Sequence, residues 1–255
     1  MQNRFEGKVI AIAGGSGGIG NAVSQRLAEE GAVVIVGDIN LQAAERTVAE
    51  IKAKGGRAMP FRLDVGDENN VKEFVQAAVS AHGGIDGFHV NALDASLRDD
   101  DIDVTTMDMT FYDRFLQVNQ RGYFLCTRYA VPELIKRGGG CMLYTSSGAA
   151  YVGMDTKPVY AMAKSAIHAL ARNVASRWGK QGVRSNVIAP GLIFHPAVEA
   201  TLGANAIQEI LKGVKSPRLG DPKDIAAMAA LLLSDDGEFV TGQVISVDGG
   251  ATMRA

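Results

Sequence analysis

The sequence of 255 residues is poor in cysteine and has no long apolar run. Its two cysteines, Cys126 and Cys141, fall in an expected helix and an expected strand, which suits small buried hydrophobic side chains better than a disulfide. No stretch approaches the roughly 20 apolar residues that a membrane-spanning helix needs. The first apolar run, residues 9–13, is too short for the core of a signal peptide, and charged residues precede it. We therefore expect a cytoplasmic protein that does not enter a membrane.

An excess of positive charge is also lacking. Lys and Arg number 26 against 28 Asp and Glu, so the net charge of -2 supplies no broad field that would attract nucleic acid or an anionic membrane. Three of the four histidines, His82, His89 and His168, form no metal-ligand pattern. The composition favours a small-molecule partner and predicts no metal site.

Short apolar segments alternate with longer amphipathic ones along most of the chain. The apolar segments have the length and β-branched content of buried parallel strands and cover residues 8–14, 32–38, 57–65, 86–92, 141–147, 184–190 and 242–248. The segments with helical spacing cover residues 18–31, 41–54, 68–82, 111–137 and 159–180. This alternation predicts an α/β fold: one doubly wound (Rossmann) seven-stranded parallel sheet with helices on both faces, forming a single domain over residues 1–255.

Two stretches break the alternation, and ligands bind near the carboxyl ends of the strands in such sheets. Residues 94–109 contain an acidic run, which we interpret as a solvated loop; its carboxylates are Asp99, Asp100, Asp101 and Asp103. Residues 195–217 have helical spacing with no strand after them. We expect a substrate-binding segment at about 192–217, inserted within the domain.

A glycine-rich loop, AGGSGGIG, follows the first expected strand and opens the first expected helix. Its glycines fit two spacings, either Gly14, Gly18 and Gly20 or Gly15, Gly17 and Gly20. A pyrophosphate must approach the backbone N–H groups of a helix N-terminus, and a Cβ there would block it. The context of strand, loop and helix makes a dinucleotide site a strong prediction.

The second expected strand ends in Asp38, eighteen residues after Gly20. Its carboxylate can accept hydrogen bonds from the ribose hydroxyls of NAD, whereas the 2′-phosphate of NADP would meet its negative charge. The neighbouring residues supply no Arg or Lys for such a phosphate; they are Gly15, Ser16, Gly17, Ile39 and Asn40. We therefore predict NAD as the cofactor.

Tyr160 and Lys164 lie four residues apart at the start of an expected helix, so their side chains project from one face. An unperturbed tyrosine is a poor base near neutral pH, but a nearby ammonium favours the phenolate. Such a pair can move a proton to or from a substrate oxygen while a cofactor handles the hydride. A hydroxyl from Ser147 could hold the same oxygen.

With these motifs the chain resembles the short-chain dehydrogenases/reductases of the basic single-domain type, over almost its whole length. The glycine motif matches at Gly14, Gly18 and Gly20, the tyrosine–lysine motif at Tyr160 and Lys164, the serine at Ser147 and the asparagine at Asn119. The resemblance implies that Tyr160 is the acid/base, that Lys164 assists it and binds the nicotinamide ribose, that Ser147 orients substrate and that Asn119 holds a relay water. It also implies a homotetramer built partly by the helices that begin near Phe111 and Val159.

The resemblance implies a set of cofactor contacts along the carboxyl edge of the sheet. Besides Tyr160 and Lys164, these are Gly14, Ser16, Gly18, Ile19, Gly20, Asp38, Ile39, Asp64, Val65, Asn91, Ala92, Pro190, Gly191 and Ile193. Three positions depart from the family pattern: Val90 stands where an asparagine is usual, Leu93 where a glycine is usual, and His195 where a threonine is usual. Leu93 should narrow the pocket without preventing cofactor binding.

Together these features predict an NAD-dependent oxidoreductase that interconverts a secondary alcohol and a ketone. The substrate is expected to be apolar or cyclic and steroid-like, because its predicted surroundings are largely apolar; they include Leu93, Tyr151, Met154, Leu192 and Phe194. The alternative is a non-catalytic dinucleotide-binding redox sensor. Such a sensor has no need for Asn119, Ser147, Tyr160 and Lys164 together, which favours the enzyme.

Overall fold

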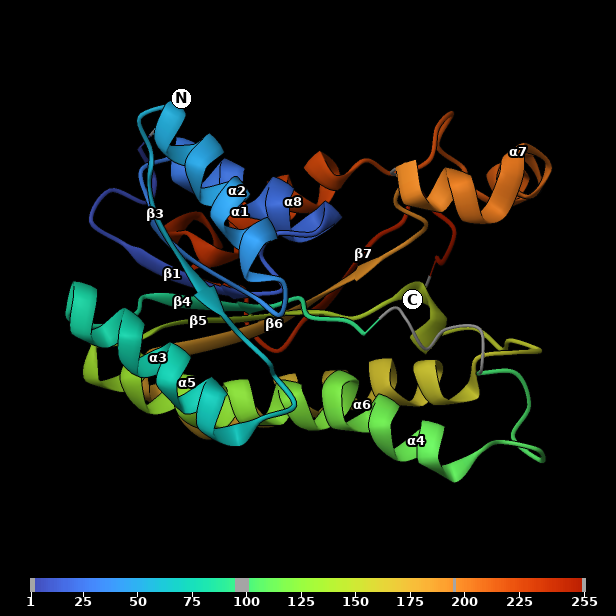
Figure 1. Ribbon diagram of the computed structural model, residues 1–255, viewed down its shortest axis with the longest axis horizontal. Coiled ribbons are helices and arrows are strands. Elements are labelled where there is room, and N and C mark those ends of the chain that lie inside the picture. The colour runs from blue at the N-terminus through green and yellow to red at the C-terminus, as the bar shows by residue number, and fades with distance from the viewer. Residues whose placement is uncertain (1–2, 95–100, 195, 254–255) are drawn as a thin grey trace.

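The seven apolar segments form the strands of one parallel sheet in a computed structural model that describes residues 3–94, 101–194 and 196–253 (Figure 1). The strands are β1 (Val9–Ala13), β2 (Val33–Asp38), β3 (Arg57–Arg62), β4 (Gly87–Val90), β5 (Gly140–Thr145), β6 (Val183–Pro190) and β7 (Val244–Val247). Their order is β3-β2-β1-β4-β5-β6-β7, and every neighbouring pair is parallel. The predicted doubly wound fold is confirmed. The order reverses between β1 and β4, which is where such folds bind ligands.

Helices cover both faces of the sheet (Figure 1). On one face lie α1 (Gly18–Glu29), α2 (Leu41–Ala53) and α8 (Pro222–Leu233); on the other lie α3 (Glu68–His82), α5 (Gly122–Lys136) and α6 (Pro158–Trp178). Each layer has its own buried core, with Leu27 and Ile51 on the first face and Phe74 and Ile167 on the second. Burial on both faces explains why the strands are almost continuously apolar.

The segment expected to be one helix over residues 111–137 is helical throughout, but it has an irregular centre. It comprises α4 (Met109–Leu116), a π-helical turn (Gln117–Arg121) and α5. A π turn adds one residue to the helical repeat and often occurs at functional sites. Here it contains Asn119, so the widened turn lies at a predicted catalytic position.

Two helices follow β6. The first, α7 (Pro196–Gly213), lies within the segment that we assigned to substrate binding. The second, α8, had no counterpart among the sequence predictions, although its start carries clear helix signals. Asp221 and Asp224 form a reciprocal capping box around Pro222 at the first helical position. The helix packs against α1 and buries alanine and leucine side chains in the first core.

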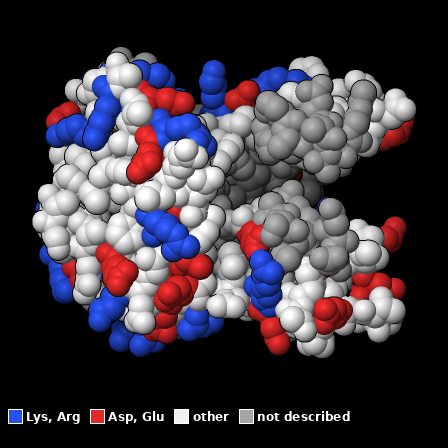
Figure 2. Space-filling view, in the orientation of Figure 1, with Lys and Arg blue, Asp and Glu red and all other residues white. Residues whose placement is uncertain are grey.

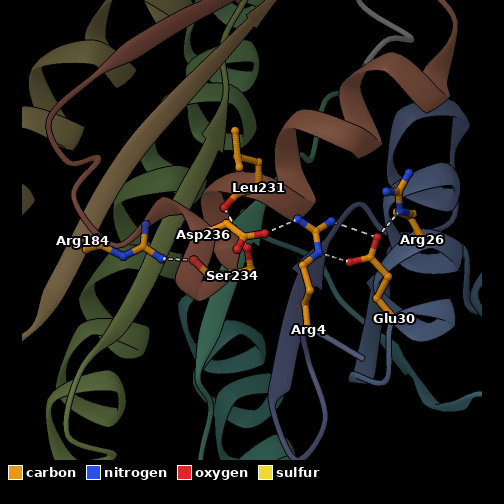
Figure 3. A network of polar contacts seen from close by, with 7 residues as sticks. All are labelled: Arg4, Arg26, Glu30, Arg184, Leu231, Ser234 and Asp236. Atoms are coloured by element: carbon orange, nitrogen blue, oxygen red, sulfur yellow. Dashed lines mark hydrogen bonds and ion pairs between the residues drawn. The ribbon is translucent and has the colours of Figure 1, made fainter. Parts of the chain in front are cut away.

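An ion network ties the start of the chain to the end of α8 (Figure 3). Arg4 donates to both oxygens of Glu30, at 2.6 and 2.9 Å, and to Asp236 at 2.7 Å. Arg26 also contacts Glu30, whose side chain is only 3% exposed. Arg184 donates to the backbone oxygen of Ser234 at 3.1 Å. The network holds the segment before β1 against residues more than 200 positions away in the sequence.

The two cysteines are buried, and charged side chains lie on the surface (Figure 2). Cys126 and Cys141 are free and buried, and burial raises the pKa of the Cys126 thiol to about 12. Figure 2 shows Lys and Arg mixed with Asp and Glu over the described surface of this face. Within the described ranges, no helix is long and apolar enough to cross a membrane, and no three His, Cys, Asp or Glu side chains gather in a cluster that could hold a metal ion.

Candidate active site

Two positions of the glycine loop after β1 strongly favour glycine in this backbone conformation. Gly14 has a φ of +76°, and a Cβ there would lie 2.8 Å from the Cα of Ala92. A Cβ on Gly20 would lie 1.9 Å from the carbonyl oxygen of Gly14. Gly15 has neither a positive φ nor so close a backbone contact. The structure therefore favours the spacing through Gly14, Gly18 and Gly20 over the alternative.

The N-terminus of α1 fits the phosphates of a dinucleotide. Gly17 is the N-cap residue, and no side chain caps the N–H groups of the first turn. Gly17 and Gly18 are exposed, and a Cβ on Gly17 would meet only open space, so the approach to these donors is clear. Ile19 is half-buried beside them. Free N–H groups at the positive end of a helix form a ready anion site.

Asp38 at the end of β2 lies against this loop. One of its carboxylate oxygens accepts a hydrogen bond from Ser16 N at 3.2 Å, and the other accepts from Asn40 N at 3.1 Å. The side chain of Asn40 in turn caps α2. The carboxylate is thus fixed beside the glycine loop, and Ile39 next to it is 55% exposed. An acceptor at this point suits the hydroxyls of a ribose.

The loops after β3 and β4 border the same space. Asp64 accepts from Gly66 N at 2.9 Å, and the following Val65 is buried. Asn91 donates from its side chain to the carbonyl oxygen of Gly14 at 3.1 Å, and Ala92 packs on Gly14. These contacts bring the predicted positions after β1, β3 and β4 to one edge of the sheet.

The loop after β6 is held equally closely. A Cβ on Gly191 would lie 2.8 Å from the Cα of Asp248, and Gly191 N donates to Val247 O at 3.1 Å. Pro190 is the last residue of β6, and Ile193 forms a bridge with Gly220. His195 lies outside the described residues. The loop thus leaves the same carboxyl edge as β1 and β4.

Tyr160 and Lys164 lie in the first two turns of α6, as predicted. Lys164 is only 2% exposed, and its Nζ donates to Thr145 O at 3.1 Å and to the hydroxyl of Tyr123 at 3.2 Å. Nζ lies 5.9 Å from the centroid of the Tyr160 ring, which packs edge-on against Phe115. A buried ammonium therefore lies beside the ring of a half-buried tyrosine.

Ser147 and Asn119 lie on two segments that contact α6, the turn after β5 and the π turn. Ser147 follows β5 by two residues, and its Oγ accepts from Ala149 N at 3.2 Å. Asn119 is fully buried; its Oδ1 accepts from Asp94 N at 3.3 Å and its Nδ2 donates to Phe115 O at 3.0 Å. The side chain of Asn119 thereby connects α4 to the loop that follows β4.

Asp101 corrects the interpretation of the acidic stretch as solvated. It is 2% exposed, and its two carboxylate oxygens accept from Val159 N at 3.0 Å and from Tyr160 N at 2.8 Å. Its backbone oxygen accepts from Lys157 N at 2.7 Å. Asp103 is exposed as expected, while Asp99 and Asp100 lie outside the described residues. A distant side chain therefore caps the helix that carries the tyrosine.

A sequence feature does point to this cap. The residue before Pro158 is Lys157, whose side chain does not cap the helix. Its φ is 68°, the only positive φ of a non-glycine residue in the part of the chain that the structure describes. A helix that begins at a proline without Ser, Thr, Asp or Asn before it needs a cap from elsewhere. The sequence alone does not say which acidic residue supplies it.

Sequence reasoning also missed polar residues near Lys164 and the end of β5. The Oγ of Ser146 donates to Lys164 O at 2.9 Å and lies 2.8 Å from Nε2 of His168, whose ring packs on Tyr151. On β4, His89 is fully buried with Nε2 at 2.8 Å from Thr145 Oγ1, and burial lowers its pKa to about 3. These residues surround the end of β5 with hydrogen-bonded groups.

Figure 2 shows the surface hollowed between the lobe with α7 and the lobe with α4. Of the side chains predicted to contact substrate, Met154 is 44% and Phe194 38% exposed, while Leu93, Tyr151 and Leu192 are half-buried. Exposed apolar side chains such as Met154 and Phe194 are available for contact with an apolar ligand.

Known proteins are similar to this chain in sequence and in fold. Residues 13–252 match the family model described as enoyl-(acyl carrier protein) reductase. An uncharacterized oxidoreductase of Mycobacterium tuberculosis is 36% identical over 251 residues, which cover 98% of this chain and 100% of that protein. A 2,5-dichloro-2,5-cyclohexadiene-1,4-diol dehydrogenase of Sphingobium indicum is 34% identical over 250 residues, 98% of each chain.

A solved structure of 7α-hydroxysteroid dehydrogenase, complexed with NADH and 7-oxo glycochenodeoxycholic acid, matches with a TM-score of 0.92. It is 33% identical, and the match covers 99% of this chain and 97% of that one. Fold and site together define an α/β protein of the dinucleotide-binding class. The matches place it further: this chain belongs to the short-chain dehydrogenase/reductase family.

Proposed function

We propose that the protein is an NAD-dependent oxidoreductase that interconverts a secondary alcohol and a ketone. The observation that carries the proposal is the buried Lys164, whose ammonium lies 5.9 Å from the ring of Tyr160 at the carboxyl edge of the sheet. Burying an ammonium is costly and gives no obvious packing advantage, so its presence beside a tyrosine favours a chemical role.

In this proposal the chain's own residues move one proton and hold one oxygen. Tyr160 takes the hydroxyl proton of the alcohol during oxidation and returns it to the carbonyl oxygen during reduction. Lys164 stabilises the phenolate, Ser147 donates to the same substrate oxygen, and Asn119 holds a relay water. The bound cofactor supplies or accepts the hydride.

The preference for NAD rests on Asp38, whose carboxylate lies beside the glycine loop. A 2′-phosphate there would meet a like charge, while ribose hydroxyls would find acceptors. The related hydroxysteroid dehydrogenase structure contains NADH, which agrees with this assignment. We expect NADH to bind at least tenfold more tightly than NADPH, and Asp38→Ala to narrow that difference.

For the substrate we propose an apolar, cyclic secondary alcohol. Met154, Phe194 and Leu93 offer apolar contact. The names of two relatives, a hydroxysteroid dehydrogenase and a cyclohexadienediol dehydrogenase, describe ring-bearing alcohols and support this class. The segment at 192–217 is proposed to contact the substrate.

The direct test follows turnover of cyclic alcohols and ketones by nicotinamide absorbance, with NADH binding measured by fluorescence. Tyr160→Phe should lower kcat by at least a thousandfold while NADH binding is retained, because only the proton-transfer group is removed. Tyr129→Phe, which removes a hydroxyl bonded to Glu68 away from the site, serves as the matched control. A Tyr160→Phe enzyme with wild-type turnover would refute the proposal, and NADH binding without turnover of any alcohol would favour a sensor.

We also propose that the enzyme is a homotetramer assembled partly through α5 and α6. Phe124 on α5 is 54% exposed beside a groove between these helices and α4, which Leu116, Ile167 and Leu170 also line. An exposed apolar groove of this kind is typical of subunit contacts. Light scattering should give four times the chain mass of 26.9 kDa; a monomer would contradict the assembly without affecting the catalytic proposal.

A further inference from the structure

A second tyrosine contacts the lysine of the site. Tyr123 on α5 is fully buried, and its hydroxyl accepts a hydrogen bond from Lys164 Nζ at 3.2 Å. The same hydroxyl lies 3.0 Å from Thr145 O and 3.1 Å from Ala92 O, to either of which it can donate its single proton. The face of its ring is 5.0 Å from Nζ. One side chain thus joins the lysine to the ends of β4 and β5.

We infer that Tyr123 is a positioning residue that holds the Lys164 ammonium beside Tyr160 and thereby sets how strongly the phenolate is stabilised. The inference rests on the proposed function, since it assigns Tyr123 a role in the chemistry of that same pair. It concerns a residue 41 positions from the lysine, outside the sequence motifs of the site.

The hydroxyl of Tyr123 is suited to hold a cation and unsuited to act as a base. Burial raises the pKa of Tyr123 well above its usual value, and the charge of a Tyr160 phenolate raises it further. The phenol therefore keeps its proton at every working pH and accepts from Nζ through its lone pair. The electron-rich ring face adds a favourable cation–π contact.

Two neutral oxygens accept hydrogen bonds from this buried ammonium. Thr145 O and the Tyr123 hydroxyl accept from Nζ, and a buried charge depends strongly on each such acceptor. Other titratable groups around the ammonium include Tyr160 on the same helix and Cys126 on α5, which burial keeps neutral. Farther away are His168, which is bonded to Ser146, and the Asp101 carboxylate at the start of the helix. Loss of the Tyr123 hydroxyl would therefore remove an acceptor that holds the Lys164 ammonium in place.

The chain contains a matched control for this residue. Tyr144 on β5 is also fully buried, and its ring stacks on that of Tyr123 with the centroids 6.4 Å apart. Its hydroxyl bonds to Thr127 Oγ1 at 2.9 Å instead of to the lysine. Replacing either tyrosine by phenylalanine removes one buried hydroxyl from the same core, but only Tyr123→Phe removes an acceptor from Lys164.

The experiment measures kcat for alcohol oxidation against pH in the wild type, Tyr123→Phe and Tyr144→Phe. A hydrogen bond to a charged group is worth roughly a factor of 10 to 100 in an equilibrium. We expect Tyr123→Phe to lower kcat about tenfold near neutral pH and to move the acidic limb of the profile to higher pH, because the phenolate is less stabilised. NADH affinity should stay within about twofold, and Tyr144→Phe should leave the profile in place.

A Tyr123→Phe profile that coincides with the wild type, or an equal shift in Tyr144→Phe, would overturn the inference. If Tyr123→Phe does not fold, 3-fluorotyrosine at position 123 keeps the hydroxyl and the shape but weakens the oxygen as an acceptor. That protein should show a smaller shift in the same direction, and an unshifted profile would count against the inference. The two proposals fail separately: an active Tyr160→Phe enzyme refutes the function, whereas an inactive Tyr160→Phe with an unaltered Tyr123→Phe refutes only the role of Tyr123.

Discussion

Removal of the Asp101 carboxylate should weaken both the fold and the catalytic helix. In Asp101→Ala, the N–H groups of Val159 and Tyr160 lose the acceptors that lie 3.0 and 2.8 Å away. Because Asp101 is 2% exposed, water cannot replace the carboxylate without rearrangement of the loop. The helix would begin with uncapped donors at the turn that carries the proposed acid/base.

The size of the effect follows from these contacts. Loss of an N-cap costs about 0.5–2 kcal/mol, and a single hydrogen bond to a charged group contributes about 1.5–3 kcal/mol. Two bonds to one carboxylate are not additive, so we expect a loss of about 3 kcal/mol. For a chain of this size that corresponds to roughly 6–12 °C in Tm. A small displacement of Tyr160 should also reduce kcat by about tenfold or more.

Thermal unfolding and steady-state kinetics of three variants test this reasoning. Asp101→Asn keeps one acceptor oxygen and should lose about half as much stability as Asp101→Ala. Asp103→Ala is the control, since that carboxylate is exposed and, among the described residues, accepts from Thr105 in its own loop. If Asp101→Ala unfolds within 1–2 °C of the Asp103→Ala variant (about the precision implied by 0.5 kcal/mol), the buried cap does not carry the energy assigned to it.

Three further predictions concern the loop, a buried histidine and the ion network. Gly20→Ala should lower the free energy of unfolding by about 1–3 kcal/mol in urea, because the added methyl would lie 1.9 Å from Gly14 O. Gly17→Ala is the control and should cost far less, because its methyl would face open space; equal costs would contradict the geometry. His89 has a folded pKa of about 3 against an ordinary 6.5, so the unfolded chain alone binds its proton between these values. The free energy of unfolding should fall as the pH drops below 6.5, by up to about 1.4 kcal/mol per pH unit. Urea unfolding at pH 7.5 and at pH 5 measures this difference, and the part due to His89 should be absent in His89→Gln. Burial raises the pKa of Glu30, but the hydrogen bonds and charges of Arg4 and Arg26 outweigh it and leave the pKa below 4.5 (Figure 3). The contribution of Glu30 to the free energy of unfolding is present above pH 4.5 and is lost as the pH falls through its lower pKa in the folded protein. In Glu30→Gln, the free energy of unfolding should therefore depend less on pH in that range. An unchanged dependence would exclude the network as a source of acid sensitivity.

Local patterns in the sequence were sufficient for the sheet and for the central motifs. Strands such as β1 and β2 are apolar on both faces because helices cover both, and this is visible in five or six consecutive residues. The glycine loop is equally local, since a positive φ and a helix start are properties of adjacent residues. The spacing of Tyr160 and Lys164 follows from the helical repeat. The cofactor contacts and substrate segment implied by family resemblance stay predictions.

Only the tertiary structure decided which residues far apart in the chain contact one another. The choice of Asp101 as the cap of α6 depends on a contact between residues 58 positions apart, and Asp99, Asp100 and Asp103 were equally eligible by type. The meeting of Tyr123 with Lys164 likewise requires α5 and α6 to pack side by side on β5. Hydrogen bonds and burial act through space, so a sequence pattern can name the residue types that a site needs but cannot choose among equivalent partners.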